Sequence, residues 1–431
     1  MKVRDWLRGE RGFLLLLVAG GTLIRLLWLW RTQGVIDGLF DAGEATRVAL
    51  AFARGDGIAD AYYPGQGSTA HLLPLNPMIA GGILWLFGPQ STAASIALLT
   101  WSLGQTFCGY LLVRALFQRL GADSRTLRWG SALLFLVPPF IPQELIDFRY
   151  WEGGSALCLA AGNLLVIARL RDAPPPGWRM ITAIAALSAS TFFVSPPVGL
   201  AVDLCWAIYA VLHLPSAKCA QIAVSSAFAL TILIAPWAIR NERVLGAFVP
   251  LRSNFGIELA LANHPAALSS RTPENVFAER LDAIHPSANP ALRPIIAQRG
   301  GELRYAQSLA RSTEDWIAAH PLAFAQLWLR HLSEFFFPRA WQMYFTGWEG
   351  MREARAITIS LVQLLGLIGL IANRRRYALV LVYIAGIALP FALFQPMSRY
   401  IFLAWPLLAF PAAEAVLKAL RRTRPVANQT H

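Results

Sequence analysis

Long apolar runs alternate with charged loops along this chain of 431 residues, and the kind of charge changes from one loop to the next. Lys and Arg cluster in every second loop, at 2–11, 114–128, 169–179, 218, 374–376 and 418–424. The loops between them hold the acidic residues, at 37–44, 144–152 and over most of 239–354. Because cytoplasmic loops of membrane proteins carry the excess of Lys and Arg, the pattern predicts a multi-pass bacterial inner-membrane protein. Both termini are expected in the cytoplasm, and the functional site on the periplasmic face.

The composition agrees with this interpretation. Hydrophobic residues make up 56% of the chain and charged residues only 15%, whereas a soluble domain carries about 25% charged residues. The net charge of +13 is also a feature of nucleic-acid-binding proteins. Here the positive residues flank the apolar runs, so membrane topology explains them and no nucleic acid is expected. The four cysteines fall in or at the ends of the runs, which indicates neither a disulfide framework nor a cysteine-based metal site.

The apolar runs predict an all-α polytopic protein with about ten transmembrane helices. Most runs approach the roughly 20 residues needed to cross the hydrocarbon core. They lie at 12–31, 91–115, 127–141, 151–170, 180–195, 198–214, 219–238, 355–373, 377–394 and 400–418. The run 77–88 would span only about 18 Å as a helix. A re-entrant or interfacial helix, entered at Asn76-Pro77, is therefore expected there.

Two outer segments are too long to be simple connections, and they define the expected domain organisation. An N-terminal transmembrane core, 1–238, contains the acidic first outer loop at 32–76. Residues 239–354 form a periplasmic or juxtamembrane region, in which His320-Pro321 separates two helices. The second of these helices is rich in Leu, Trp and Phe and is expected in the membrane interface. Transmembrane helices and a basic cytoplasmic tail, 355–431, complete the chain.

The first outer loop holds the candidate catalytic residues. A helix at about 42–54 would place Asp41 and Glu44 on one face, because residues three apart lie side by side, and Arg47 continues that face. A carboxylate there suits a general base that acts on an acceptor hydroxyl. The same spacing fits a capping box, in which Asp41 caps the helix and Glu44 reaches back. His71, near the end of the loop, is either a substrate contact or an ordinary satisfied polar residue.

Polar residues at the outer ends of the spans are candidate substrate ligands. Asp147, Arg149 and Glu152 crowd the start of one span, where they either bind substrate or form ion pairs in an interfacial belt. Arg399 interrupts two apolar runs and suits a phosphate ligand because of its bidentate guanidinium, or it anchors the span edge. Arg25 inside the first span is expected to snorkel outward.

The segment RSNFGIELALANHP supplies further hydrogen-bonding groups for a sugar or an acceptor, unless it is an ordinary turn followed by an amphipathic helix. Its candidate ligands are Asn254, Asn263 and His264, and Arg252 at its start is, like Arg399, a candidate ligand for a phosphate.

Four segments, taken in their order along the chain, carry a resemblance to a known family. They are FARGDGIADAYY at 52–63, HLLPLNPMIAGGILWLFG at 71–88, PWAIRNERVLGAFVPLRSNFGIELALANHP at 236–265 and QPMSRYIFLAWP at 395–406. With the preceding span and acidic loop, they resemble the GT-C superfamily of membrane glycosyltransferases. The resemblance is strongest to the bacterial protein-mannosyltransferase and aminoarabinose-transferase branch.

The resemblance implies an undecaprenyl-phosphate-linked sugar as donor and a catalytic acid in the first outer loop. That branch commonly has Asp-Glu at the start of the loop helix, whereas this chain has Gly43-Glu44. Either Glu44 or Asp41 is therefore expected to be the base. The acceptor would be a hydroxyl of a lipid, a glycan or a protein, and membrane lipids are further expected partners.

The function expected from these observations is an inverting glycosyltransferase of the periplasmic face. One alternative is a polymerase or ligase of envelope polysaccharide. A second is a transporter or flippase of a lipid-linked sugar, for which two related halves with matching broken helices would be typical. No cofactor is expected, and no Asp, His and Glu residues have metal-ligand spacing, although some GT-C branches depend on a divalent metal.

Overall fold

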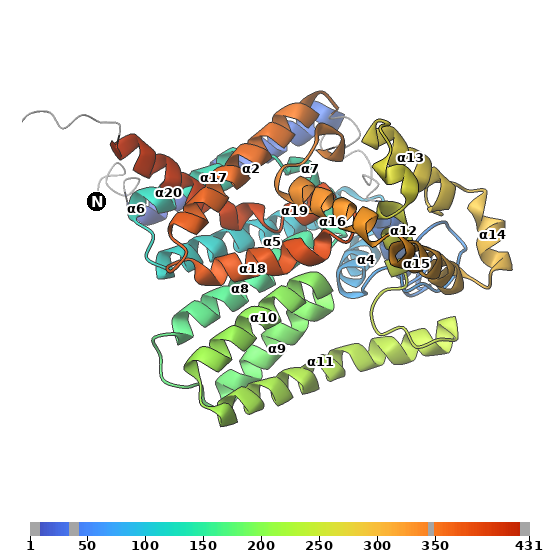
Figure 1. The fold of residues 1–431 in the computed structure, drawn as a ribbon, viewed down its shortest axis with the longest axis horizontal. Coiled ribbons are helices and arrows are strands. Elements are labelled where there is room, and N and C mark those ends of the chain that lie inside the picture. The colour runs from blue at the N-terminus through green and yellow to red at the C-terminus, as the bar shows by residue number, and fades with distance from the viewer. Residues whose placement is uncertain (1–8, 34–42, 344–348, 423–431) are drawn as a thin grey trace, which may run out of the picture.

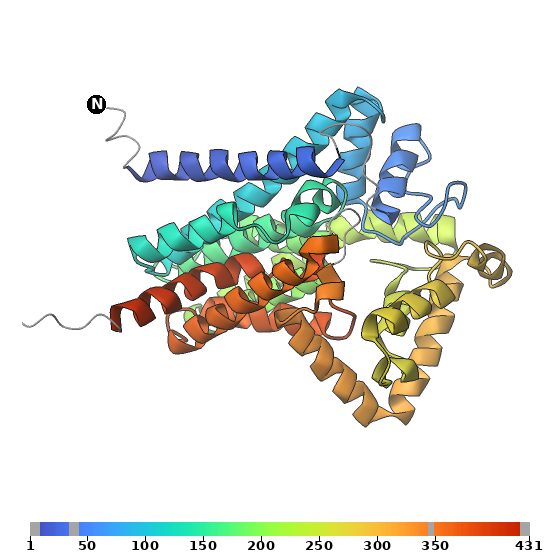
Figure 2. The same cartoon turned by 90° about the horizontal axis from the view of Figure 1, so that it is seen from above.

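The computed structural model describes residues 9–33, 43–343 and 349–422. Within these ranges the regular structure is helical apart from one isolated β-bridge between Ala59 and Ser68. Long helices form a bundle, and shorter helices and loops gather at one end of it (Figures 1 and 2). The expectation of an all-α fold is confirmed.

Among the residues that the structure describes, six helices are long and apolar enough to cross a membrane. They are α2 (Glu10–Gln33), α5 (Thr92–Arg119), α8 (Gly153–Leu170), α10 (Pro196–His213), α11 (Ser216–Leu245) and α17 (Arg352–Ala372). A seventh span forms if α6 (Ser124–Leu136) is joined to α7 (Ile141–Leu145) and η1 (Asp147–Arg149) across a 70° bend. The shorter apolar helices in the described ranges are α4 (Leu75–Phe87), α9 (Trp178–Val194) and α18 (Ala378–Phe391), and the last long helix, α20 (Trp405–Arg422), packs against α17 and α6. A multi-pass membrane protein is therefore confirmed, and the count of ten crossings stays a prediction.

Small residues allow the long helices to pack closely. A Cβ atom on Gly366 of α17 would lie 2.6 Å from the carbonyl oxygen of Leu408, and one on Gly369 would lie 2.2 Å from that of Pro411. Both partners belong to α20. Because lipid is as apolar as a helix surface, close van der Waals contact of this kind is what holds membrane helices together. The two glycines thus set the α17–α20 separation.

A charged network is buried inside the bundle. The Nε atom of Arg25, on α2, lies 2.6 Å from a carboxylate oxygen of Glu144, on α7, and both side chains are completely buried. The hydroxyl of Tyr110, on α5, donates to the same carboxylate, and Arg25 also donates to the carbonyl oxygen of Phe135 at 2.9 Å. The expectation that Arg25 snorkels outward was wrong. Snorkelling applies to a cation without an internal partner, whereas here Glu144 compensates the charge.

The shorter helices surround the opposite end from the basic loops (Figure 1). From the N-terminal half come α3 (Glu44–Arg54) and α4 (Leu75–Phe87). From the long outer region come α12 (Phe255–Ala262), α13 (Pro273–Ile284), α14 (Leu292–Gln298), α15 (Glu302–Ala319) and α16 (Pro321–Phe336). The one-turn helix α19 (Ser398–Ile401) joins them from the last part of the chain. The expected helix break at His320 is confirmed.

Helix α4 begins earlier than the sequence suggested. Its N-cap is Pro74 rather than Asn76. The side chain of Asn76 is buried and donates to the backbone carbonyl of Trp151 at 2.9 Å. Asn76 therefore ties this short helix to the start of α8 and does not cap the helix.

The buried network predicts a large loss of stability when only one partner is removed. We expect Glu144→Leu to lower the free energy of unfolding by about 3–5 kcal/mol, because it leaves the Arg25 charge buried and uncompensated. The double variant Arg25→Leu with Glu144→Leu should lose less. Thermal unfolding in detergent micelles measures both.

The matched control for this measurement is Arg119→Gln, which removes an exposed ion pair with Asp172. Such pairs contribute about 0–1 kcal/mol, so its unfolding temperature should stay near that of the wild type. Equal effects of Glu144→Leu and this control would contradict the proposed role of the network.

Candidate functional site

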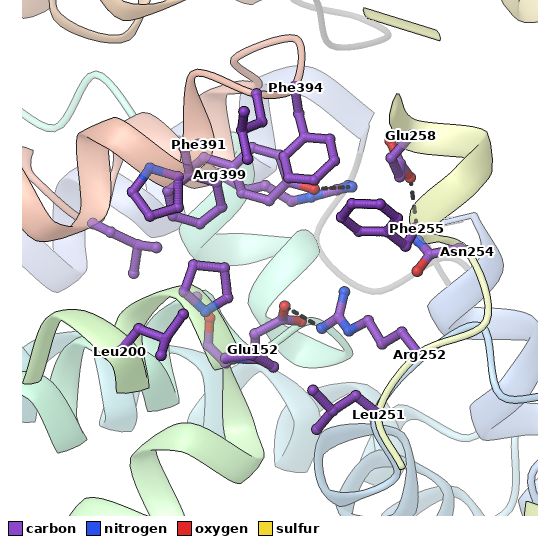
Figure 3. A pocket seen from close by; sticks show the side chains of 18 of the residues that line it. Glu152, Leu200, Leu251, Arg252, Asn254, Phe255, Glu258, Phe391, Phe394 and Arg399 are labelled. Atoms are coloured by element: carbon purple, nitrogen blue, oxygen red, sulfur yellow. Dashed lines mark hydrogen bonds and ion pairs between the residues drawn. The ribbon is translucent and has the colours of Figure 1, made fainter. Parts of the chain in front are cut away.

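A cavity of about 380 Å³ lies where the bundle meets the shorter helices. Figure 3 shows leucines and phenylalanines on opposite walls, with charged side chains between them. The lining residues come from five segments far apart in the sequence: 151–153, 195–200, 251–258, 390–394 and 399–403. The cavity is therefore a product of the tertiary fold and combines an apolar interior with a charged rim.

Three prolines lie at helix ends in the apolar wall of the cavity. Pro196 and Pro197 begin α10, where missing N–H groups cost nothing. Pro390 lies one residue before the end of α18. All three residues line the cavity together with Leu200 and Phe391. The start of α10 and the end of α18 therefore lie at the cavity. Because proline has no backbone N–H group, these positions add no unpaired donor to the cavity wall.

Two arginines form the charged rim. Arg252 Nη2 lies 2.5 Å from a carboxylate oxygen of Glu152, and the buried Arg252 Nε has no hydrogen-bond partner among the described residues. The guanidinium of Arg399, on α19, lies 4.1 Å from the ring centre of Trp151 and donates to the Tyr400 hydroxyl at 3.3 Å. Both guanidiniums line the cavity, so the rim offers N–H donors to an anion.

Carboxylates accompany these arginines. Glu258 accepts a hydrogen bond from Asn254 at 3.3 Å, and both side chains line the cavity (Figure 3). Asp147, on η1, and Glu258 both interact electrostatically with Arg399. The positive charge at the rim is thus partly balanced, and the polar groups remain available for directional hydrogen bonds.

A second group of polar residues surrounds Glu44 in the first outer loop. The Glu44 carboxylate accepts a hydrogen bond from Ser287 Oγ at 2.6 Å, and His285 Nδ1 lies 3.9 Å from the same oxygen. The hydroxyl of Tyr62 is 3.1 Å from His71 Nδ1. The ring centres of Tyr62, His71 and His285 lie 4.9–6.4 Å apart, edge to face. We call these five residues the Glu44 cluster.

The electrostatic setting of the Glu44 cluster fixes its charges at neutral pH. Burial favours the neutral acid at Glu44, but attraction to His285 and His71 and the Ser287 hydrogen bond outweigh it and lower the pKa of Glu44 to about 2. Burial lowers the pKa of His71 to about 3, although Glu44 acts in the opposite direction. At pH 7 Glu44 is therefore ionised and His71 neutral.

The Glu44 cluster lies close to the cavity rim. The positive charges of Arg252 and Arg399 contribute to the lowered pKa of His71, which requires them to be near its ring. Glu44 itself is absent from the cavity lining. The cluster and the rim are therefore neighbouring parts of one candidate site.

Glu302, the first residue of α15, holds the first outer loop in place. Its buried carboxylate accepts hydrogen bonds from the side chains of Gln66 at 2.6 Å, Thr69 at 2.7 Å and Ser253 at 2.8 Å, and from the backbone N–H of Ala70 at 2.9 Å. Three of these donors lie just before His71, and the fourth, Ser253, is next to Arg252. Glu302 thus joins the Glu44 cluster to the cavity rim.

Helix α11 reaches the same loop from the other side. Near its end, Arg240 donates to the backbone carbonyls of Thr69 at 2.7 Å and Ile58 at 2.5 Å. Arg47, on α3, donates to the carbonyl of Ala61 at 2.9 Å. The loop backbone is therefore fixed by guanidinium donors from two helices.

The structure brings together most of the site residues predicted from the sequence. Glu152, Arg252, Asn254 and Arg399 line the cavity, Asp147 interacts electrostatically with Arg399, and Glu44 and His71 belong to the Glu44 cluster. Asp41 lies outside the described residues. The capping-box interpretation was wrong for the helix start, because α3 begins at Glu44 with Gly43 as its N-cap.

Three predicted ligands lie elsewhere. Arg149 is buried and is absent from the cavity lining. Asn263 donates to the carbonyls of Leu259 and Leu393, at 3.0 and 2.8 Å, and joins the end of α12 to the chain after α18. His264 lines a smaller hollow with Arg330 and Glu334. Their part in substrate binding stays a prediction.

Several residues of the site had no signal in the sequence. In the sequence, nothing distinguishes these residues from other loop or helix residues, and only the fold places them beside Glu44 or the rim. They are Tyr62, His285, Ser287, Glu258 and Glu302. In the described ranges, no group of three or more His, Cys, Asp or Glu side chains is placed to hold a metal ion.

Comparison with known proteins addresses the fold. No protein-family model and no curated protein sequence match the chain. The archaeal oligosaccharyltransferase AglB from Archaeoglobus fulgidus, in complex with an inhibitory peptide and a dolichol-phosphate, matches with a TM-score of 0.54 at 14% identity, over 99% of this chain and 53% of AglB. The same enzyme tethered to an acceptor peptide containing the NVT sequon gives 0.55 at 13% identity, over 97% and 50%.

A third structure, ArnT from Cupriavidus metallidurans bound to undecaprenyl phosphate, gives a TM-score of 0.40 at 14% identity, over 96% of this chain and 79% of ArnT. The oligosaccharyltransferase belongs to the GT-C superfamily. This chain has a GT-C fold. It spans about half the length of the oligosaccharyltransferase, and at such low identity the likeness establishes the fold alone.

The pKa of His71 predicts how the stability of this protein depends on pH. Between the ordinary value of 6.5 and about 3, the unfolded chain binds a proton that folded His71 does not, so the free energy of unfolding falls as the pH falls. From pH 7 to pH 4 we expect the wild type to lose about 2–3 kcal/mol more than His71→Gln. Thermal unfolding across this range measures the difference.

The control is His320→Gln, since His320 is exposed and its removal should leave the pH dependence of the wild type. Identical pH dependence in His71→Gln and the wild type would show that His71 titrates normally in the folded protein.

Glu302 gives a prediction about the loop. Glu302→Ala leaves four donors without their acceptor, and each buried unpaired donor costs about 1–3 kcal/mol. We expect faster hydrogen exchange at the Ala70 amide and a lower unfolding temperature. Glu314→Ala, at an exposed position on the same helix, should change neither. Unchanged exchange at Ala70 in the Glu302 variant would contradict the anchoring role.

Proposed function

We propose that the protein is an inverting glycosyltransferase that moves a sugar from a polyprenyl-phosphate donor to an acceptor hydroxyl. One observation carries the proposal: within a GT-C fold, a cavity with apolar walls ends in a rim with two guanidinium groups. An isoprenoid chain suits the walls and its phosphate suits the rim. The complex of the archaeal oligosaccharyltransferase with dolichol-phosphate supports a lipid phosphate as the ligand class.

The arginines would bind the phosphate in complementary ways. Arg252 keeps one nitrogen on Glu152 and lines the cavity, so its outer N–H groups can donate to a phosphate oxygen while the ion pair is kept. Arg399 is held by Trp151 and Tyr400, which orients its planar group. Charge-assisted hydrogen bonds of this kind are about twice as strong as neutral ones. Together the two residues would stabilise the charge that develops on the leaving phosphate.

The reaction then needs an acceptor for one proton. The acceptor hydroxyl oxygen bonds to the anomeric carbon from the face opposite the phosphate, and the bond from that carbon to the phosphate oxygen breaks, which inverts the configuration. The bonding electron pair leaves with the lipid phosphate. The hydroxyl proton passes to a first-loop carboxylate, Glu44 or Asp41, and from there to water.

The lowered pKa of Glu44 favours a late proton transfer. A carboxylate with a pKa of about 2 accepts a hydrogen bond readily but is a weak base toward a free hydroxyl. The hydroxyl becomes acidic only as its new bond to carbon forms. Glu44 would first orient the acceptor and then take the proton, a contribution typically of about 10²–10⁴-fold in rate.

The test is a transfer assay with purified protein, a membrane-lipid extract as acceptor source and a panel of radiolabelled undecaprenyl-phosphate sugars. We expect one donor to be consumed. Glu44→Gln or Asp41→Asn should abolish transfer, and Arg399→Gln should lower kcat/KM by roughly 10–100-fold through loss of a charged hydrogen bond. The control is Arg304→Gln, at an exposed position of α15, which should retain full activity.

Other outcomes identify the alternatives. Consumption of an oligosaccharide diphosphate and of no monophosphate sugar would favour a polymerase or ligase. Movement of sugar-lipid across vesicles without bond transfer would favour a flippase. Full activity of both Glu44→Gln and Asp41→Asn would remove the first-loop base from the mechanism.

A further inference from the structure

A second cavity, of about 110 Å³, lies at the other end of the bundle between α8, α10 and α18. It belongs to no part of the site described above. Its walls are mainly apolar: Ile167, Ile208, Leu212, Leu379 and Val382. The polar residues that line it are Arg171, Tyr209 and His213. Apolar walls and a basic edge thus occur together here as well.

The cavity opens toward the lipid-facing surface of the bundle. Leu212 and Ile208, on α10, keep 70% and 38% of their surface exposed, although they lie in a membrane-spanning helix. Tyr209 is fixed beside them, because its hydroxyl donates to the carbonyl of Leu170 at 3.2 Å and its ring stacks on that of His213. An acyl chain can therefore enter from the membrane, whereas a water-soluble ligand would meet apolar walls.

The edge of the cavity carries positive charge. Arg171 follows the last residue of α8, is exposed, and has no ion-pair partner among the described residues. Arg374 and Arg375 are also exposed and without such partners, in the turn that leads into the α18 residues lining the cavity. The acidic residues of this end are already engaged: Asp172 pairs with Arg119, and Glu414 pairs with Arg376 and Lys418.

We propose that this cavity binds one anionic phospholipid, with an acyl chain between α10 and α18 and its phosphate on Arg171. The guanidinium supplies a bidentate donor to phosphate oxygens. Arg374 and Arg375 add long-range attraction for the negative headgroup, of the order of 1 kcal/mol for each basic residue near a membrane surface. A zwitterionic lipid would fill the walls equally well but would gain less from these three unpaired charges. The site is independent of the glycosyl-transfer chemistry.

The experiment uses the full chain purified in a neutral detergent and counts retained lipids by native mass spectrometry. The probes are phosphatidylglycerol and phosphatidylcholine with identical acyl chains, and glycerol phosphate as a headgroup without chains. We expect one phosphatidylglycerol to bind at least 10-fold more tightly than phosphatidylcholine, and glycerol phosphate not to bind. Equal affinities for the two lipids, or binding of glycerol phosphate at the affinity of the lipid, would overturn the proposal.

Variants assign the binding to this cavity. Arg171→Gln should remove the preference for phosphatidylglycerol, and Ile208→Trp should reduce the retention of phosphatidylglycerol by filling the space for the chain. The matched control is Arg179→Gln, an exposed arginine at the same end that does not line the cavity. Equal losses in the Arg171 and Arg179 variants would mean diffuse surface attraction and would overturn the site. An unfolding temperature equal to that of the wild type would show that each variant keeps the fold.

Discussion

Four hydrogen bonds to one buried carboxylate determine how the two parts of the candidate site meet. Glu302 accepts from the first outer loop on both sides of Thr69 and from Ser253 next to Arg252. It also occupies the first turn of α15, where a negative charge is favoured by the helix dipole. The loop carries His71 and the other segment carries a rim arginine. A single side chain therefore fixes the position of the Glu44 cluster relative to the arginines of the cavity rim.

The cavity combines two environments that usually exclude each other. A lipid phosphate needs apolar surface for its chain and several donors for its charge, within a few ångströms. Leu200 and Phe391 supply the first, and Arg252 and Arg399 the second (Figure 3). The half-buried arginines are tolerated here because Glu152 pairs with Arg252 and Glu258 interacts electrostatically with Arg399, so that the resting site carries little uncompensated charge.

Local and periodic features of the structure could be predicted from the sequence. The apolar runs gave most helices within a few residues, and charged residues at the outer ends of spans pointed to Glu152, Arg252 and Arg399, which do share one cavity. Charged residues in membrane-spanning segments are rare because their burial in lipid costs free energy. Such residues are therefore easily recognised in the sequence as candidate functional residues. Snorkelling, by contrast, was the wrong expectation for Arg25, whose side chain is buried beside Glu144.

Contacts between residues that are far apart in the chain could not be predicted from the sequence. Arg25 finds Glu144 at a separation of 119 residues, and Glu44 finds Ser287 at a separation of 243. Neither pair has a motif, because the contact depends on how whole helices pack. Glu44 itself was identified, but its neighbours His285 and Ser287 belong to a long outer region in which nothing marks them. The chemical setting of the base is therefore a tertiary property.

Helix α11 is longer than a membrane crossing requires. Its 30 residues amount to about 45 Å, well beyond a hydrocarbon core of roughly 30 Å, and Arg240 near its far end holds two carbonyls of the first outer loop. For a helix that crosses the bilayer, this length sets how far the loop stands from the opposite membrane surface. A thicker bilayer would draw the loop closer to the lipid headgroups, and a thinner one would lift it away. The thickness of the surrounding membrane thereby becomes part of the geometry of the candidate site.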